Sequence, residues 1–535
     1  MFVPSAMMQI YIAYLGSLPD GDYIPTSHHF SLLQALFKQS SAENYLIRSY
    51  RRSFNGFAAK LTDEEAKKLA SFKGVISVFP NKVYHLQTTR SWDFMGFNQT
   101  VKRNATAESN VVIGVIDTGI WPESDSFSDE GFGSSPKVER ILQGWTKLHI
   151  KLIGARVYVT DSARDTEGHG SHTASIAAGN HIENASFYGL AEGTARGGVP
   201  SARIAAYKVC NKGCTSQNIL AAFDDAIADG VDILTVSLGS YFSTVFYVDA
   251  IAIGAFHAAE KGILVVQSAG NSGPVAQRVA SVAPWMLSVA ASTTDRFFID
   301  RVVLGNGKTL TGFSVNSFSL NKTKVPLVYG LQASTECNET AARACMHGCL
   351  NKSLVNNKIV LCDVKDGLDE AHAAGALGSI TKTSLMNISF VVPLPSAALA
   401  TDDYSSLISY QSSTSIIPNG SSKNSDAELA YGSGHVNPVK AINPGLVYDN
   451  AEGDNIRFLC SIGYSEDKIR KISGTNSSCP KTSTLPRNFN YPTLAALVKA
   501  GDSFTVNFQR TVTNVGLATS TYNATTSSSS NLELK

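Results

Sequence analysis

Runs of apolar residues separated by amphipathic stretches dominate the middle of the chain. Residues 111–116 form a continuous apolar run, typical of a strand that is covered on both faces of a sheet. Three similar runs are predicted as strands: Arg203–Val209, Ile233–Leu238 and Ile263–Ser268. Helical spacing between them predicts helices over Gln217–Asp229 and Val248–Lys261. This alternation predicts an α/β fold with a mainly parallel sheet, whose functional residues collect just beyond the carboxyl ends of its strands.

A different pattern precedes this region, over residues 9–87. Strands are predicted at Gln9–Leu15, Tyr45–Tyr50, Phe57–Leu61 and Val75–Phe79, and a helix over His28–Gln39. Thr62 and Glu65 have the spacing of a capping box, which predicts a second helix that runs through Leu69. Two strand–helix–strand runs indicate a small α+β module with an antiparallel sheet.

The remainder of the chain divides into three parts. Residues 320–410 include a Cys-rich stretch and are interpreted as an inserted domain, with strands at Lys358–Cys362 and Ser389–Val392 around a helix over Leu368–Ala376. Gln411–Asn424 is a Ser/Asn-rich linker. From residue 485 a β pattern is expected, with Ser503–Thr513 alternating, and the chain stops at Lys535 after too few strands for a closed sandwich.

Composition narrows the class of protein. The 535 residues are 43% hydrophobic and 17% charged, with a net charge of +1, which is ordinary for a globular protein. The balanced charge offers no basic field for nucleic acid, and no apolar run is long enough to span a bilayer. Residues 1–9 do not read as a signal peptide, so we expect an N-terminus that is truncated.

The density of glycosylation sites nevertheless favours a secreted, extracellular or cell-wall protein, and the cysteines are compatible with one. Acceptor sites for N-glycosylation are abundant: Asn98, Asn104, Asn184, Asn321, Asn338, Asn351, Asn387, Asn419, Asn476 and Asn523. The eight cysteines are Cys210, Cys214, Cys337, Cys345, Cys349, Cys362, Cys460 and Cys479. They allow disulfides without demanding them.

Candidate chemistry begins where the first apolar run ends. Asp117 follows that run directly, and a carboxylate at such a strand end can hold a neighbouring imidazole in one tautomer, or can simply cap a turn. His169, between two glycines, is expected in the first turn of a small-residue helix, where it could act as a general base or be structural. His169 and His172 also have helical spacing for a metal pair, but the acidic residue of zinc-protease motifs is absent between them. We therefore expect no metal and no cofactor.

Two further segments end predicted strands. Asn271, in Ser-Ala-Gly-Asn-Ser-Gly-Pro, could donate its side-chain amide to a developing oxyanion, or could serve only in a turn. Ser237-Leu238-Gly239 could pair with an extended substrate backbone, or could simply be core.

Together these segments closely resemble the subtilisin superfamily, specifically the cucumisin-like subtilases of plants. The resemblance is carried by VVIGVIDTGIWPES from Val111, RDTEGHGSHTASIAAG from Arg164, SAGNSGP from Ser268 and AYGSGHVNPVKAINPGLVYD from Ala430. It extends from about residue 9 to the end of the chain, in the family's order. The family is one of endopeptidases that cleave peptide bonds with an Asp-His-Ser triad.

The resemblance implies a role for each part. Residues 9–87 match the inhibitory propeptide, an intramolecular partner that would be removed near Thr88–Ser91. Residues 88–319 and 425–484 match the catalytic domain, 320–410 the protease-associated insert and 485–535 a fibronectin III-like tail cut short. Asp117, His169 and Asn271 match the triad acid, the general base and the oxyanion donor, and Ser237, Leu238 and Gly239 match the substrate-binding strand.

One element of the family pattern is missing. The nucleophile belongs in a Gly-Thr-Ser tripeptide before a buried helix, and this chain contains no such tripeptide. It passes from Tyr410 through the polar linker to Ala430, where the catalytic helix should lie. Ser473–Pro480 looks somewhat similar, but it comes after Asp449 and lacks the small residues of a buried helix. Lys147–Ile150 also departs from the family, which usually has a Cys-containing stretch there.

These departures suggest a faulty gene model or a pseudogene, rather than a selected non-catalytic protein. Two functions therefore compete: a serine endopeptidase whose true sequence is longer, and an inactive pseudo-protease that binds a partner through the propeptide-like module or the insert. Nucleotide hydrolysis is excluded for Gly307-Lys308-Thr309, because Val302 stands where a phosphate loop needs glycine. That stretch predicts a hairpin turn with Asn306-Gly307 at its tip.

Overall fold

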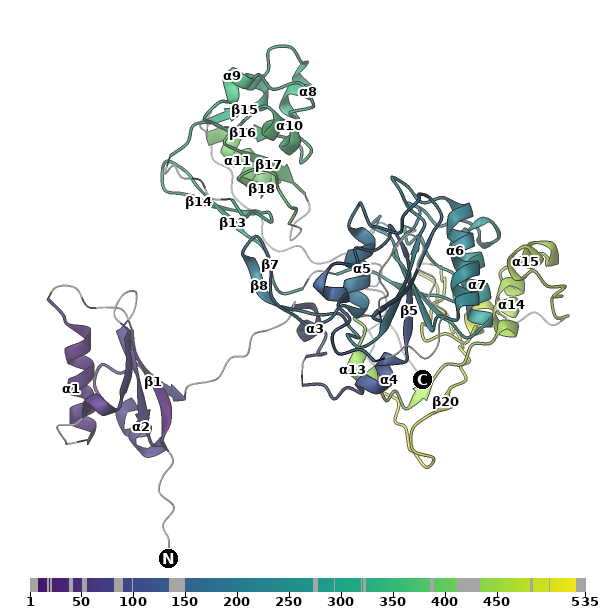
Figure 1. Ribbon diagram of the computed structural model, residues 1–535, viewed down its shortest axis with the longest axis horizontal. Helices are drawn as coiled ribbons and strands as arrows, with labels where there is room; N and C mark the ends of the chain where they lie inside the picture. Colours follow the sequence, from purple (N-terminus) through teal and green to yellow (C-terminus); the bar gives the residue numbers. More distant parts are fainter. Residues whose placement is uncertain are drawn as a thin grey trace, which may run out of the picture. The chain divides into compact units, whose positions relative to one another are not determined.

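The computed structural model describes residues 8–16, 19, 22–37, 42–50, 55–80, 90–98, 100–133, 150–272, 278–292, 294–318, 320, 324–384, 389–410, 434–481, 485–499 and 501–525. The expected linker over Gln411–Asn424 and most of the atypical Lys147–Ile150 stretch lie outside these residues. The chain divides into two compact units, Met1–Leu86 and Gln87–Lys535, each of which is described by itself (Figure 1). Among the described residues, no helix combines the length and hydropathy of a membrane span.

The N-terminal unit is the expected α+β module. Its elements are β1 (Gln9–Gly16), α1 (Pro25–Phe37), β2 (Leu46–Tyr50), β3 (Asn55–Leu61), α2 (Asp63–Ala70) and β4 (Ser77–Pro80). The strands form an antiparallel sheet in the order β2-β3-β1-β4. The capping box at α2 is confirmed: Thr62 Oγ1 accepts from Glu65 N, and the Glu65 carboxylate accepts from Thr62 N. Leu33, Phe57 and Leu69 are fully buried between the helices and the sheet.

A histidine lies in the core of this unit. The His29 side chain is fully buried, with Nε2 2.8 Å from Asn55 Oδ1 and Nδ1 2.6 Å from Ser49 Oγ. Burial lowers the pKa of His29, and the hydrogen bond with Asn55 only partly opposes that shift. The neutral imidazole is therefore the form that fits the folded module.

The second unit is built on a six-stranded parallel sheet, as the apolar runs predict. Its strands are β5 (Val112–Asp117), β6 (Leu152–Val157), β9 (Arg203–Lys208), β10 (Ile233–Val236), β11 (Leu264–Ser268) and β12 (Leu287–Val289). They pair in the order β12-β11-β10-β5-β9-β6. Every residue of β5 is buried, because α5 (His169–Ala178) lies on one side of it and α6 (Ser216–Asp229) and α7 (Ala250–Glu260) lie on the other (Figure 1).

The two faces of this sheet are covered unequally. On the α5 side, Ile113 and Val115 of β5 pack against α5, but the neighbouring strands β10–β12 are not covered to the same extent by any described residue. Parallel register places six side chains on this part of the face: Ile233, Thr235, Leu264, Val266, Leu287 and Val289. Leu264 is 47% exposed, Leu287 41% and Val289 36%. We call these six residues the open half-sheet, because a parallel sheet normally has both faces covered.

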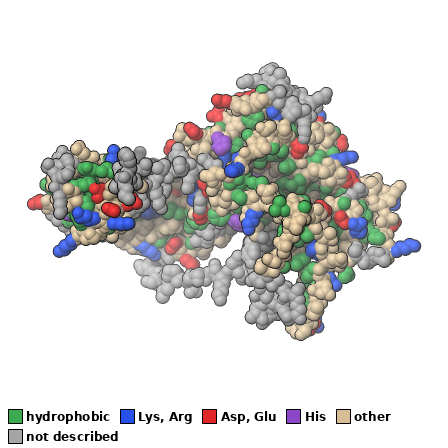
Figure 2. Space-filling view, turned by 90° about the horizontal axis from the view of Figure 1, so that it is seen from below, with side chains coloured by type: hydrophobic (Ala, Val, Ile, Leu, Met, Phe, Trp, Pro, Cys, Tyr) green, Lys and Arg blue, Asp and Glu red, His purple; other side chains and the backbone are tan. Residues whose placement is uncertain are grey.

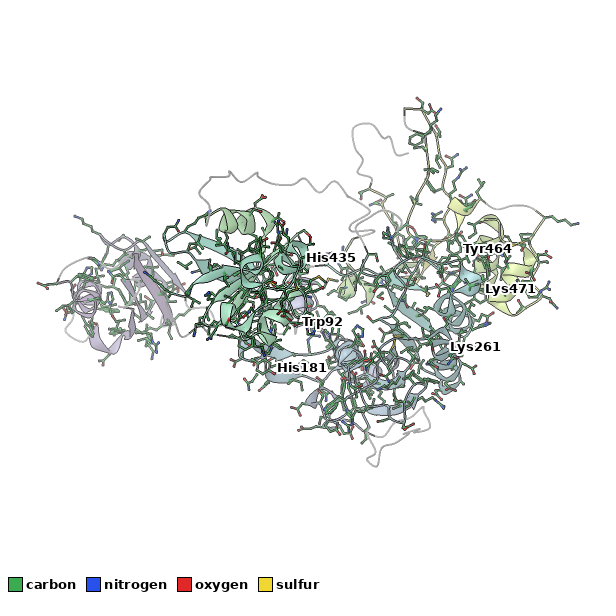
Figure 3. The ribbon with its side chains drawn as sticks, turned by 90° about the horizontal axis from the view of Figure 1, so that it is seen from above. Trp92, His181, Lys261, His435, Tyr464 and Lys471 are labelled. Atoms are coloured by element: carbon green, nitrogen blue, oxygen red, sulfur yellow. A yellow bond between two sulfur atoms is a disulfide. The ribbon has the colours of Figure 1, made fainter. Side chains whose placement is uncertain are left out.

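Shorter elements complete the layers around the parallel sheet. They are α3 (Arg90–Phe94), α4 (Ala105–Ser109), the antiparallel hairpin β7 (Ile182–Phe187) and β8 (Leu190–Ala195), α13 (Pro438–Ala441), α14 (Glu452–Ser461) and α15 (Glu466–Ser473). α14 and α15 bury Leu459 and Ile469 in the same core as α6 and α7. Tyr464, labelled in Figure 3, joins them to the segment before α7, because its hydroxyl accepts from Phe246 N at 3.3 Å. Residues 452–473 therefore belong to the α/β core.

A lysine side chain is buried in this unit. Lys151, just before β6, is fully buried, and its Nζ donates to the carbonyls of Pro200 and Ala202, at 2.8 Å for Ala202. The ammonium also lies 4.7 Å from the centre of the Phe132 ring. Burial and then the nearby Arg203 charge lower the pKa of Lys151 to about 7.

A second sheet contains the inserted region. Its strands are β13 (Asp300–Val303), β14 (Thr309–Phe313), β15 (Leu327–Tyr329), β16 (Ile359–Cys362), β17 (Gly378–Thr383) and β18 (Ser396–Ala400), in the order β13-β14-β18-β17-β16-β15. Its helices are α8 (Glu339–Arg343), α9 (Lys352–Val355), α10 (Gly367–Ala373) and α11 (Thr401–Tyr410). The predicted hairpin turn is confirmed, since Val303 pairs with Thr309 around Gly307, whose φ is +85°. This sheet begins before the expected boundary at residue 320.

Two strand predictions are wrong. Ser389–Val392 is not a strand; Val391 makes only an isolated bridge to Val315, and the strand that joins the sheet is β18, a few residues later. Ser503–Thr513 is also not a strand, because its residues are mostly exposed and only β20 (Thr513–Asn514) pairs, with β19 (Leu446–Val447). Alternation alone does not make a strand where no neighbouring strand offers a ladder of hydrogen bonds.

Arg510 organises the tail instead. Its Nε donates to Tyr491 O at 2.6 Å, and its Nη atoms donate to Arg487 O and Thr493 O at 2.8 Å each. One guanidinium thus ties the segments near 490 and 510 together without a sheet.

All eight cysteines are paired. The disulfides are Cys210–Cys214, Cys337–Cys349, Cys345–Cys362 and Cys460–Cys479. On the face shown in Figure 2, basic and acidic side chains are interspersed without a field of one sign. The pairing fits an oxidising compartment.

Candidate active site

The candidate residues meet at one edge of the parallel sheet. Asp117 is the last residue of β5, Ser237 follows β10 directly, and Ser268 ends β11. These three strands are neighbours in the order β5-β10-β11, and register aligns their carboxyl ends. The segments 237–239 and 268–271 therefore lie beside Asp117, at the edge where parallel sheets carry functional residues.

Asp117 and His169 form a hydrogen-bonded pair. Asp117 Oδ1 is 2.8 Å from His169 Nδ1, although the two residues are 52 positions apart in the sequence. The Asp117 side chain is 1% exposed, whereas that of His169 is 49% exposed. His169 is the first residue of α5, as expected. A carboxylate on Nδ1 fixes the tautomer in which Nε2 is free to accept a proton.

The carboxylate of Asp117 is held by two further donors. Thr118 N donates to Oδ1 at 2.7 Å, and Thr173 Oγ1 donates to Oδ2 at 3.1 Å. These hydrogen bonds hold the carboxylate in one orientation. The approach of α5 to β5 also requires glycine at 170, because a Cβ there would lie 2.3 Å from Gly119 O.

No serine in the described part of the chain bonds to the His169 ring. The two Ser–His contacts found there are Ser49–His29 in the N-terminal unit and Ser292–His435, at 3.2 Å. Neither of those histidines has a carboxylate on its ring among the described residues. The Ser473–Pro480 stretch is also unsuitable, since Ser473 ends α15 rather than starting a helix, and Cys479 is in a disulfide.

The other expected site residues lie at exposed positions beyond the strand ends. Asn271 is exposed and lies three residues beyond β11, and Gly239 is exposed beyond β10. The buried Gln267 side chain donates from Nε2 to Leu238 O, which links the strand ends that carry these two segments. No group of His, Cys, Asp or Glu that could hold a metal occurs among the described residues. His172 lies exposed on α5.

Sequence reasoning missed the residues that support the pair. Thr118, Asp165, Ser171 and Thr173 make hydrogen bonds around Asp117 and His169. The sequence offered no ordinary capping signal for them, because Asp165 lies four residues before the first residue of α5 and the N-cap position is Gly168.

An aspartate–histidine pair at the carboxyl edge of a parallel sheet is two thirds of the catalytic arrangement of serine-type endopeptidases. The subtilase family model matches residues 108–487, the peptidase inhibitor I9 model matches 10–87, and a fibronectin type-III model matches 488–535. The chain belongs to the subtilase family, with an inhibitor I9 propeptide and a fibronectin-like C-terminal segment.

Its relatives in Arabidopsis thaliana are similar over nearly the whole chain. Subtilisin-like protease SBT4.3 is 43% identical over 631 residues, which cover 96% of this chain and 86% of that protein. SBT4.6 is 44% identical over 642 residues, which cover 96% and 87%. A solved structure of the epidermin leader peptide processing serine protease from Staphylococcus aureus is more distant, with 18% identity, a TM-score of 0.23 and coverage of 50% of this chain and 61% of that one.

These figures reveal an internal difference in length. The 96% of this chain that aligns with SBT4.3 is about 514 of its 535 residues, but the alignment spans 631. About 117 aligned positions, the difference between 631 and 514, therefore face gaps in this chain.

Proposed function

We propose that this polypeptide is the framework of a secreted serine endopeptidase, in which Asp117 orients His169 as the general base. The observation that carries the proposal is their 2.8 Å hydrogen bond, together with the exposed ring of His169. In the complete reaction a serine hydroxyl gives its proton to His169 Nε2 as its oxygen attacks the peptide carbonyl. Asp117 keeps the imidazole oriented and stabilises the imidazolium that forms.

The strand ends beside the pair provide the remaining roles in this proposal. The Asn271 amide donates to the oxyanion, where one such donor contributes about 10²–10³ to the rate. Ser237, Leu238 and Gly239 present backbone groups to an extended peptide, which adds to the sheet edge as a strand. Their position next to Asp117 in the parallel register supports these roles.

We further propose that the attacking serine and its helix are absent from this chain. Three observations support this: no Gly-Thr-Ser tripeptide occurs, about 117 aligned positions of SBT4.3 face gaps, and the open half-sheet lacks a covering layer among the described residues. Loss of the nucleophile from a triad costs about 10⁶ in turnover, and a residual of about 10³ over water can remain. The chain as it stands is therefore expected to be inactive and poorly stable.

A fluorophosphonate probe tests both parts, because it labels only an activated serine. The purified chain should not be labelled. The same chain, with a subtilase segment that bears Gly-Thr-Ser and its helix inserted between Tyr410 and Ala430, should be labelled. The matched control carries the insert with its Gly-Thr-Ser serine changed to Ala. Labelling of the uninserted chain at a serine would refute the absence of a nucleophile. The transcript across these codons should reveal an in-frame exon if the gene model is faulty.

One observation favours a second candidate, a non-catalytic binder. A cavity of about 600 Å³ opens in the inserted sheet beside Val302, Leu327 and Ile380. Its size is that of a small-ligand or peptide site. Retained binding of peptides by the unlabelled chain would support this reading.

The propeptide and the compartment complete the proposal. Residues 9–87 act as an intramolecular inhibitor until they are removed near Thr88–Ser91, a role supported by the match to inhibitor I9. Extracellular or cell-wall secretion is supported by four disulfides. Protein or peptide substrates are the partners, without nucleic acid.

A further inference from the structure

The helix that carries His169 begins without an ordinary cap. Its N-cap position is Gly168, with φ +89°, and glycine has no side chain to accept from the first free N–H groups. The first four amides of a helix have no partner within it. Asp165, four residues before His169, fills this need instead.

The Asp165 carboxylate accepts five hydrogen bonds. The donors are Glu167 N at 3.1 Å, Gly168 N at 2.8 Å, Thr118 Oγ1 at 2.9 Å, Ser171 N at 2.8 Å and Ser171 Oγ at 2.8 Å. Asp165 is 4% exposed. Burial acts to raise its pKa, but the bonds from Ser171, Gly168 and Glu167 outweigh burial and lower the pKa to about 2. The carboxylate is therefore ionised throughout the neutral range.

Thr118 joins this cap to the strand that ends in Asp117. Its hydroxyl donates to Asp165 Oδ1 at 2.9 Å and accepts from Gly170 N at 2.7 Å. Its own amide donates to Asp117 Oδ1 at 2.7 Å, the oxygen that faces His169. Thr118 is 5% exposed. Its hydroxyl is hydrogen-bonded to the first turn of α5 and to Asp165, and its backbone amide is hydrogen-bonded to the Asp117 carboxylate.

We propose that the Thr118 hydroxyl, anchored by Asp165, is the positioning group that sets the distance between Asp117 and His169. The two residues come from separate elements, and the chain between them is 51 residues long. The bridge from Thr118 to Gly170 fixes the first turn of α5 one residue from His169. The role of His169 as a general base comes from the proposed function. The contacts of Thr118, Asp165 and Gly170 hold whether or not a nucleophile is present.

Substitution at 118 separates positioning from packing. Thr118→Val keeps the shape and removes both hydroxyl bonds, whereas Thr118→Ser keeps the hydroxyl. The readout is the low-field proton resonance of His169 Nδ1–H in the full chain with ¹⁵N-labelled histidine, assigned by its loss in His169→Gln. Thr381→Val, at a 1%-exposed threonine in the inserted sheet, is the matched control.

We expect the resonance in the unsubstituted chain, in Thr118→Ser and in Thr381→Val. In Thr118→Val the Nδ1 proton should exchange with water at least about 10-fold faster, or the resonance should disappear, at an unchanged melting temperature. An unchanged resonance in Thr118→Val would overturn the proposal.

A second measurement needs no variant. Amide exchange at Gly170 and Ser171 should be slowed by about 100-fold relative to unprotected amides, because Gly170 N donates to Thr118 Oγ1 and Ser171 N donates to the Asp165 carboxylate. Exchange at the unprotected rate would also overturn the proposal. If the inserted chain is not labelled by the fluorophosphonate while the His169 resonance persists, the proposed function fails and the positioning role stands.

Discussion

The buried Lys151 allows a quantitative prediction about stability and pH. In Lys151→Met a side chain of similar length replaces the amine, and the carbonyls of Pro200 and Ala202 lose their donor. The folded-state pKa is about 7, against an ordinary value of 10.5. Between these values the unfolded chain binds more protons than the folded chain, so the stability of the native protein rises with pH across this window.

The magnitude follows from linkage. With pKa values of about 7 and 10.5, the cost of folding with this lysine is about 4 kcal/mol at pH 7 and about 2 kcal/mol at pH 9. The native chain should therefore gain about 2 kcal/mol from Lys151 between pH 7 and pH 9. Lys151→Met lacks this gain, and the loss of two hydrogen bonds costs roughly 1–3 kcal/mol at every pH.

Urea unfolding at pH 6, 7, 8 and 9 measures the difference between the two proteins. We expect Lys151→Met to be more stable than the parent by about 1–3 kcal/mol at pH 7, to keep that advantage at pH 6, and to lose about 2 kcal/mol of it by pH 9, where the two proteins should be close. Lys261→Met, at an exposed lysine, should show no such trend. If the difference in unfolding free energy between Lys151→Met and the parent does not change with pH, the lowered pKa of Lys151 is refuted.

Three other substitutions test further parts of the structure. The lowered pKa of His29 means that the N-terminal module loses stability as the pH falls below about 6.5, because the unfolded chain takes up the proton first. In His29→Gln the urea midpoint of residues 8–80 should therefore change less between pH 7.5 and pH 5 than in the parent. The same pH dependence in the variant and the parent would contradict the assignment. Arg510→Ala removes the donor that joins several tail carbonyls, so limited proteolysis should cut residues 485–525 faster, with Lys481→Ala as the control. Gly170→Ala places a Cβ 2.3 Å from Gly119 O and should lower the stability of the second unit by about 2 kcal/mol or more, measured by calorimetry; an unchanged melting temperature would show that α5 can move away.

Much of the catalytic framework was readable from the sequence, because local and tertiary signals agree there. The run that ends in Asp117 is apolar at every position, and the structure buries all of β5. His169 starts a helix of small residues, as glycine and alanine spacing indicated. Such segments carry their own burial pattern, so their class and their approximate ends follow from periodicity.

Contacts between distant segments were not readable in the same way. Alternation in Ser503–Thr513 predicted a strand, but a strand depends on a partner, and only Thr513–Asn514 has one. The pairing of eight cysteines depends on which loops meet, which spacing does not reveal. Thr118 was passed over because its role depends on Asp165 and Gly170, both about 50 residues away.

The open half-sheet has a consequence for the life of this polypeptide in a cell. Exposed leucine and valine side chains beside β12, the edge strand of the described sheet, form the kind of surface that chaperones bind and that drives aggregation. We therefore expect cellular quality control to retain and degrade a chain that exposes this surface. The exposure of the open half-sheet would then limit the abundance of this polypeptide before it limits its chemistry.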